Sequence, residues 1–135
     1  DTAFFSLPEP RRGIVASVVT PLLVYRATAG GASSLLLSGE RIAATRAREC
    51  GLCHDVVSAE ELSGRLEELI AAVLTNSPQA LAETKRQLLA TAGANVVQQL
   101  EAAVDASAAA RKTTDAREGL AAFLEKRSPS WQPEE

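Results

Sequence analysis

Glu9 is the first residue whose position suggests chemistry, since it stands between two prolines at the end of a short apolar segment. Proline fixes its own φ angle and donates no backbone hydrogen bond, so we expect a strand over Ala3–Leu7 that ends in a stiff loop. A carboxyl group fixed beside apolar residues can be partly withdrawn from water and exchange protons as a general acid or base. On residue types alone, an exposed loop carboxylate paired with Arg11 or Arg12 is the favoured alternative.

The run Cys50-Gly51-Leu52-Cys53-His54 is the sharpest short motif, because C-x-x-C-H is the signature of covalent haem attachment. The chain has one His and no Met, so these two residue types can supply only a five-coordinate haem iron. The motif follows an Ala-rich stretch, and its glycine suits the residue that closes a helix. We therefore favour a structural role, with two small buried thiols and a His at a strand edge. A c-type haem protein, through Cys50, Cys53 and His54, is the alternative.

Other cysteine chemistry fits the same motif less well. A structural zinc ion needs four ligands, and two Cys with one His provide three. A redox C-x-x-C motif opens a helix, whose dipole activates the thiol, whereas these cysteines follow a predicted helix. We expect reduced, non-catalytic cysteines in a cytoplasmic protein, with no metal and no cofactor.

The composition is that of an ordinary globular chain. Its 135 residues include 14 basic and 17 acidic side chains, a net charge of −3, and 46% are hydrophobic. Nucleic-acid-binding domains usually carry an excess of basic residues, so nucleic acid is not an expected partner. No stretch approaches the roughly 20 apolar residues that span a bilayer, so a membrane is not expected either. At this length we expect one domain whose core buries about two-thirds of the surface of the unfolded chain.

The beginning of the chain imitates an export signal. A basic pair precedes an apolar run at residues 13–25, and Ala27-Thr28-Ala29 matches a cleavage site. Pro21 interrupts the run and the basic pair lies ten residues in, so a buried structural segment is favoured. The first residue is Asp and not Met, which indicates processing or an incomplete chain.

The first 58 residues predict short elements bounded by caps and glycines. Thr20-Pro21 has the form of an N-cap and first position of a helix, and Gly30-Gly31 is expected to break that helix. Gly39 can take the left-handed conformation that closes the next one. The expected elements here are helices from Pro21, over Ala32–Leu37 and over Ala43–Cys50, followed by a strand over Leu52–Val57.

After Ser58, apolar residues recur with a helical period. Cap residues predict three more helices, starting near Ser77-Pro78, Asn95, and Thr113 or Thr114. The polar segment Ser128–Glu135 contains two prolines and is expected to fray. The clearest apolar stripe comprises Leu62, Leu66, Leu69, Ile70, Val73 and Leu74.

Five short motifs occur together with a familiar order and spacing. The motifs are Pro8-Glu9-x-x-x-Gly13, Leu37-Ser38-Gly39-Glu40-Arg41-Ile42-x-Ala44, Ala47-x-x-x-Gly51-Leu52, Ser77-Pro78-x-Ala80-Leu81 with Lys85, and Arg117-Glu118-Gly119 with Ala122–Arg127. In that order and spacing the chain resembles the C-terminal half of the crotonase, or enoyl-CoA hydratase/isomerase, superfamily, and the similarity covers nearly all 135 residues.

The resemblance implies an α/β fold class. Residues 1–58 would form the last turn of a crotonase-like ββα spiral core, 59–127 a helical oligomerisation region, and 128–135 a frayed tail. Members of this family form trimers or hexamers, so a homotrimer or homohexamer is expected.

The resemblance also implies which residues act. Glu9 would exchange a proton with the α-carbon of an α,β-unsaturated acyl-CoA thioester, acting as general acid/base in hydration. Phe123 and Lys126 match positions that contact the CoA nucleotide bound by a neighbouring subunit; the alternatives are core packing for Phe123 and a solvated charge for Lys126. Coenzyme A belongs to the substrate, so no separate cofactor is implied.

The sequence departs from the family pattern in ways that limit the resemblance. Ala16-Ser17 stands where many members have Pro-Gly, and the half that carries the oxyanion-hole segments and a second glutamate lies outside these residues. The function expected is therefore the C-terminal part of an enoyl-CoA hydratase. An enoyl-CoA isomerase is the alternative within the family, and a non-enzymatic helical assembly module is the alternative from another class.

Overall fold

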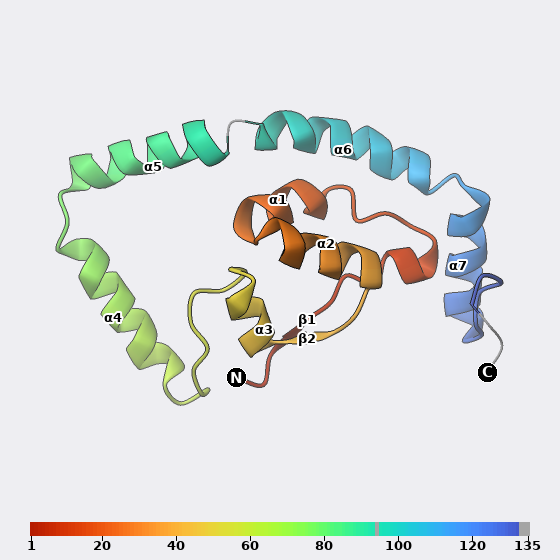
Figure 1. Cartoon of the computed structure of the whole chain (residues 1–135), viewed down its shortest axis with the longest axis horizontal. Coiled ribbons are helices and arrows are strands. Elements are labelled where there is room, and N and C mark those ends of the chain that lie inside the picture. The colour runs from red at the N-terminus through yellow and green to blue at the C-terminus, as the bar shows by residue number, and fades with distance from the viewer. Residues whose placement is uncertain (94, 133–135) are drawn as a thin grey trace.

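The structure of the chain, a computed structural model, describes residues 1–93 and 95–132 (Figure 1). Helices dominate this part of the chain, and the sheet has two very short strands. The elements, in chain order, are β1 (Phe4–Phe5), the 3-10 helix η1 (Pro10–Arg12), α1 (Val19–Arg26), α2 (Ala29–Ser38), β2 (Ile42–Ala43), α3 (Ala44–Glu49), α4 (Leu62–Leu74), α5 (Pro78–Ala92), α6 (Val96–Ala110) and α7 (Thr114–Glu125).

The first six elements form a small packed unit. β1 pairs antiparallel with β2, so that Phe4 lies opposite Ala43. Helices α1 and α2 pack on each other around a core of Leu23, Ala32 and Leu35. Half-buried residues close this core, namely Leu7, Ala27, Leu36, Ile42 and Leu52.

Two local predictions in this unit are wrong because side-chain and packing contacts outweigh the turn signals. Helix α1 begins at Val19, and the Thr20 hydroxyl donates to the Ala16 carbonyl (2.8 Å) instead of capping a helix that starts at Pro21. Gly30-Gly31 does not break a helix but lies in the first turn of α2, where Thr28 is the N-cap. A Cβ atom on Gly31 would lie 2.7 Å from Cβ of Cys50, so glycine is required there for close packing.

The strand predicted over Leu52–Val57 is also wrong. This segment has no strand partner in the described part of the chain and runs as a loop. Leu52 donates its backbone N–H to the Ala47 carbonyl (2.9 Å), which finishes the turn after α3. The apolar residues of the run are half-buried by packing without forming a sheet.

The helical half of the chain follows its caps closely. Ser77 accepts a hydrogen bond from the Ala80 N–H at the start of α5, and Thr113 accepts one from Ala116 at the start of α7. Asn95 occupies the N-cap position of α6 without a side-chain capping bond. Helices α4, α5 and α6 form an arc that runs away from the packed unit and returns to it where α6 packs on α1 and where α7 packs on η1 (Figure 1).

The arc leaves its apolar side chains uncovered. The accessible surface of the chain is 9792 Å², whereas a compact monomer of 14.2 kDa has about 6,800 Å². The predicted stripe of α4 is present but open, with Leu62 62% and Ile70 48% exposed. The expectation of one core burying two-thirds of the chain's surface is therefore wrong for this chain by itself, because α4 and α5 have no opposing helix layer among the described residues, whereas α6 packs on α1.

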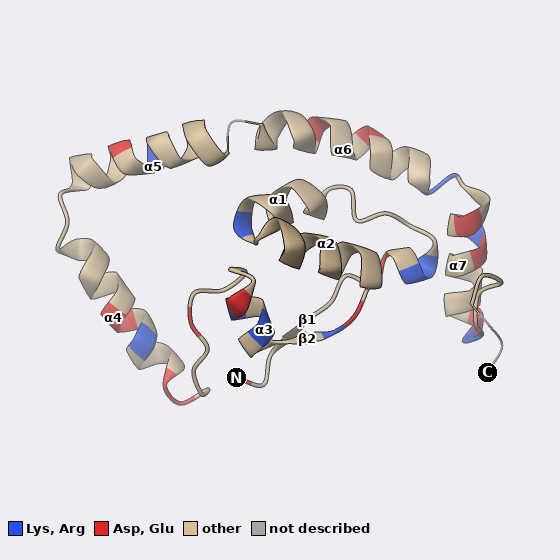
Figure 2. Cartoon of the chain, viewed as in Figure 1, with Lys and Arg blue, Asp and Glu red and all other residues tan. Residues whose placement is uncertain are grey.

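Charge and length of the helices add two observations. Figure 2 shows both acidic and basic residues along α4, α5 and α7, whereas the charged residues of α6 are acidic. Among the described helices, none combines the length and the apolar character needed to cross a bilayer.

Helix α7 and the turn around η1 make the tightest contact between distant parts of the chain. Gly13 has a left-handed φ of 67°, and a Cβ atom there would overlap the backbone carbonyl of Asp115. A Cβ on Gly119 would overlap the carbonyl of Arg12. The two backbones therefore touch with no side chain between them.

We expect Gly13→Ala to lower the free energy of unfolding by more than about 2 kcal/mol, because it adds left-handed strain to the overlap with Asp115. Urea unfolding followed by circular dichroism measures the effect. Gly30→Ala is the matched control, since nothing lies within 4 Å of a Cβ there and its φ is ordinary. Equal stability of the two variants would contradict the packing described.

Candidate active site

The backbone of Glu9 is fixed by the turn that it opens. Glu9 lies immediately before η1 with φ −51° and ψ −47°, and Pro10 occupies the first position of the 3-10 helix. The Glu9 carbonyl accepts hydrogen bonds from the N–H groups of Arg12 (3.0 Å) and Ile14 (3.1 Å). The stiff loop predicted from the two prolines is thus a 3-10 turn, which Gly13 closes in the left-handed conformation.

The Glu9 side chain is half-buried, and its Oε2 atom is shielded from solvent without a hydrogen-bond partner among the described residues. The alternative of an ion pair with Arg11 or Arg12 is wrong. Arg11 donates to the Ser38 carbonyl from Nε (3.3 Å) and Nη2 (3.2 Å), and the Arg12 guanidinium lies over the Phe123 ring. A buried polar atom without a hydrogen bond lowers stability by about 1–3 kcal/mol. We therefore expect this oxygen to be bound by a hydrogen-bond donor that is not among the described residues.

Ser17 is the second such group on the same connection. Its side chain is 9% exposed, and the hydroxyl Oγ has no partner among the residues described. It follows Ala16 at the place where the sequence departs from the Pro-Gly pattern. The connection from β1 to α1, which includes η1, therefore carries two buried polar atoms that the described residues leave without a hydrogen bond.

An apolar cavity of about 340 Å³ lies between β1 and helices α1 and α2. Its lining includes Phe5, Leu7, Leu23 and Leu35, and Leu7 precedes Glu9 by two residues. The packed unit therefore places an apolar hollow on the chain segment that leads to the carboxyl group.

Phe123 and Lys126 lie at the end of α7. The Phe123 ring is 54% exposed, and the Arg12 guanidinium carbon stands 4.0 Å from its centroid. Lys126 is exposed and ends the helix in the left-handed conformation, with φ 55°. Through Arg12, the structure brings Phe123 next to the Glu9 turn of the same chain. Their roles toward CoA bound by a neighbouring subunit stay predictions.

The cysteine motif is engaged in packing. Both cysteines are free thiols; Cys50 is buried against Gly31, and Cys53 makes a weak 3.8 Å contact with the Ala44 carbonyl. His54 is exposed on the loop that follows. Covalent haem attachment would require Cys50 to leave its contact with α2. Within the described residues, no cluster of three His, Cys, Asp or Glu side chains is placed to hold a metal ion.

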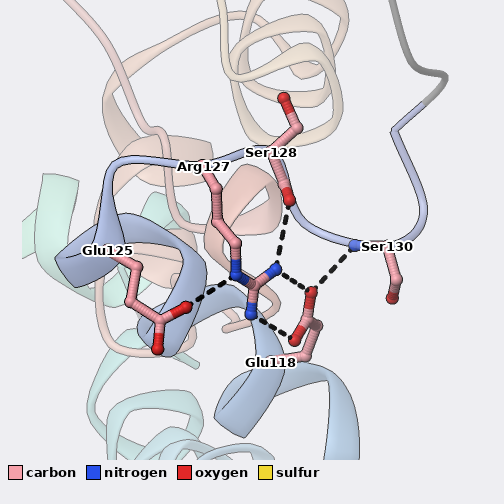
Figure 3. A network of polar contacts seen from close by, with 5 residues as sticks. All are labelled: Glu118, Glu125, Arg127, Ser128 and Ser130. Atoms are coloured by element: carbon pink, nitrogen blue, oxygen red, sulfur yellow. Dashed lines mark hydrogen bonds and ion pairs between the residues drawn. The ribbon is translucent and has the colours of Figure 1, made fainter.

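A polar network holds the segment after α7, as Figure 3 shows. Arg127 pairs with Glu118 through Nη1 (2.7 Å) and Nη2 (2.9 Å), and the Ser130 N–H donates to the same carboxylate (2.9 Å). The tail was expected to fray from Ser128, but through Gln132 it is bound by this network and a turn at Pro129; residues 133–135 lie outside the described part.

Sequence patterns gave no sign of this network or of the Arg12–Phe123 pair. Glu118 and Arg127 are nine residues apart, a separation that matches no helical spacing. Arg12 and Phe123 belong to opposite ends of the chain. Nothing short of the folded structure brings either pair together.

The network lowers the pKa of Glu118 from 4.5 to about 2, first through the Arg127 hydrogen bonds and then through the Ser130 N–H. Because the pKa is lower in the folded state, the stabilisation is complete above pH 4.5 and is lost as the pH falls toward 2. We expect the fluorescence of Trp131, the single tryptophan, to report release of the tail over this range.

Arg127→Gln removes the main cause of the lowered Glu118 pKa. The Trp131 fluorescence of this variant should therefore show no transition between pH 4.5 and 2. Arg86→Gln, which breaks an exposed ion pair with Glu83 on α5, is the matched control. Its Trp131 fluorescence should change over the same pH range as that of the parent. A transition in Arg127→Gln that coincides with the parent's would contradict this assignment.

Comparisons with known proteins give one consistent picture. The family model described as Enoyl-CoA hydratase/isomerase matches residues 1–134. A putative enoyl-CoA hydratase of Thermus thermophilus is 34% identical over 121 residues, covering 90% of this chain and 48% of that protein. A mevalonyl-coenzyme A hydratase of Aspergillus fumigatus is 33% identical over 136 residues, covering 98% of this chain and 50% of its own length.

Solved structures agree with these sequence matches. The crystal structure of an enoyl-CoA hydratase from Mycobacterium avium has a TM-score of 0.86 at 33% identity, covering 96% of this chain and 51% of that one. The likeness confirms the predicted fold class, α/β with a helical C-terminal region. The chain spans about half the length of the curated relatives that it matches.

Proposed function

Because the chain belongs to the enoyl-CoA hydratase/isomerase family, we propose that it forms the C-terminal part of an enzyme that adds water to an α,β-unsaturated acyl-CoA thioester. Glu9 is the group that exchanges the proton. The observation that carries this proposal is the shielded, unpartnered Oε2 of Glu9 on a rigid turn. Relatives named as hydratases of CoA thioesters support the reaction class.

The proposed chemistry accounts for every atom of the added water. The β-carbon of the double bond gains the hydroxyl group, and the α-carbon gains a proton. Protonated Glu9 gives up that proton, and the remaining proton of the water restores the carboxyl group. The negative charge that develops on the thioester oxygen needs hydrogen-bond donors, which we do not assign to these residues.

Substrate binding is the second part of the proposal. The exposed part of the Phe123 ring suits stacking on the nucleotide of CoA, and Lys126 suits its phosphates. Both would serve a site in a neighbouring subunit. A homotrimer or homohexamer and a cytoplasmic location stay predictions; the open apolar stripe of α4 supports association with further protein surface.

Two other functions remain alternatives to a hydratase: an enoyl-CoA isomerase and a non-enzymatic assembly module. An enoyl-CoA isomerase would use the same carboxyl group to move a proton between carbons, so only a hydratase incorporates oxygen from labelled water into its product. A non-enzymatic assembly module is favoured by the exposed apolar helices α4 to α6. Saturable binding of a short acyl-CoA would argue against that module.

We expect Glu9→Gln, in the whole protein as its gene encodes it, to lower the hydration rate at least 100-fold, because an amide cannot exchange the proton. The loss of the conjugated enoyl thioester chromophore measures the rate. Glu40→Gln, on an exposed residue that follows Gly39, is the matched control and should retain the parent rate. Near-parent turnover by Glu9→Gln would end the assignment.

A further inference from the structure

The Glu9 turn and the end of the chain share a contact that the proposed chemistry leaves unused. The Arg12 N–H donates to the Glu9 carbonyl, so Arg12 and Glu9 belong to one rigid turn. The Arg12 carbonyl in turn lies against Gly119 of α7, where any side chain would overlap it. A shift of α7 therefore moves the backbone to which the carboxyl group is attached.

The Arg12 side chain continues this contact. Its guanidinium covers one face of the Phe123 ring at 4.0 Å, one helical turn beyond Gly119. A cation over an aromatic face is attracted by the negative charge of the ring, and partial shielding from water strengthens the attraction. Two residues of α7 thus contact Arg12: Gly119 contacts its backbone carbonyl, and Phe123 contacts its guanidinium.

Helix α7 is itself anchored at both ends. Thr113 caps its first turn by accepting from the Ala116 N–H (3.1 Å). Beyond its last turn, Arg127 is bound to Glu118 on the helix, so the end of the helix cannot unwind without breaking that ion pair. A helix fixed in this way can act as a stationary support.

We propose that α7 positions Glu9 within the same chain through the Arg12–Phe123 pair, which makes Arg12 and Phe123 positioning residues for the proton exchange. The proposal rests on the proposed function of Glu9. It gives Phe123 a role that differs from stacking on CoA, because its partner here is the turn that carries the carboxyl group. The two roles differ in what the loss of the ring does to kcat and to KM.

The test uses three variants of the whole protein. Phe123→Leu removes the aromatic face and keeps a good helix former, and Phe123→Tyr restores the face. Tyr25→Leu is the matched control, because it also removes an aromatic ring from a partly exposed helix position, 38% exposed on α1, and Tyr25 does not line the apolar cavity. For each variant, kcat and KM for hydration and the hydrogen exchange of the Arg12 and Ile14 amides are measured.

We expect Phe123→Leu to lower kcat about tenfold and to speed exchange of the two amides about tenfold, while the loss of stacking on CoA is read separately as a rise in KM. Phe123→Tyr and Tyr25→Leu should stay within twofold in every quantity. A rise in KM with kcat and exchange unchanged would overturn the proposal and leave Phe123 with stacking on CoA alone. A fall in kcat of Tyr25→Leu equal to that of Phe123→Leu would also overturn it, since the effect would then be unspecific.

Failure of the proposed function is recognised separately. If the parent protein shows no hydration, the amide exchange still tests whether α7 positions the Glu9 turn. Faster exchange in Phe123→Leu upholds this positioning role, and unchanged exchange overturns it. Gly119→Ala adds a variant that acts through the backbone and should speed the same exchange more strongly, because its methyl group overlaps the Arg12 carbonyl.

Discussion

The direct contact between the Glu9 turn and α7 is the constraint on which the rest of the structure depends. Two backbones meet where both residues at the contact are glycines, Gly13 on the turn and Gly119 on the helix. Because no side chain separates them, a shift of one backbone must be accompanied by a shift of the other. The contact joins residues more than a hundred positions apart and closes the arc of helices onto the packed unit. The Arg12 guanidinium lies over the Phe123 ring, and Oε2 of Glu9 is shielded from solvent without a hydrogen-bond partner among the described residues.

The second constraint is the apolar surface that this chain cannot bury. Its accessible area exceeds that of a compact monomer by about 3,000 Å², which is more than the roughly 1,600 Å² of a standard protein interface. Part of the exposed apolar surface is the regular stripe of α4, whose helical spacing suits packing against another layer. Under the proposed function, the remainder of the enzyme or a neighbouring subunit would supply such a layer.

Elements governed by neighbouring residues were predictable from the sequence. The starts of α5 and α7 follow their serine and threonine caps, and the turn at Glu9 follows its prolines, because each signal acts within four residues. The wrong predictions concern elements that depend on contacts with distant parts of the chain. Gly30-Gly31 was expected to break a helix, yet Gly31 serves close packing against Cys50, a residue 19 positions away. The apolar run from Leu52 satisfied a strand pattern but had no partner strand. The candidate carboxyl group was found from its local context and the family motif, whereas Arg12 and Phe123 became a pair only through the fold.

The central claim, that the Glu9 carboxyl delivers the proton to the α-carbon, is tested most directly by hydration in D₂O. The whole protein and its Glu9→Gln variant are given the same α,β-unsaturated acyl-CoA, and deuterium at the α-carbon of the product is followed by NMR. The account predicts a single deuterium on one face of the α-carbon with the parent, and loss of both rate and facial preference with the variant. Incorporation at the same rate and on the same face by both proteins would contradict it.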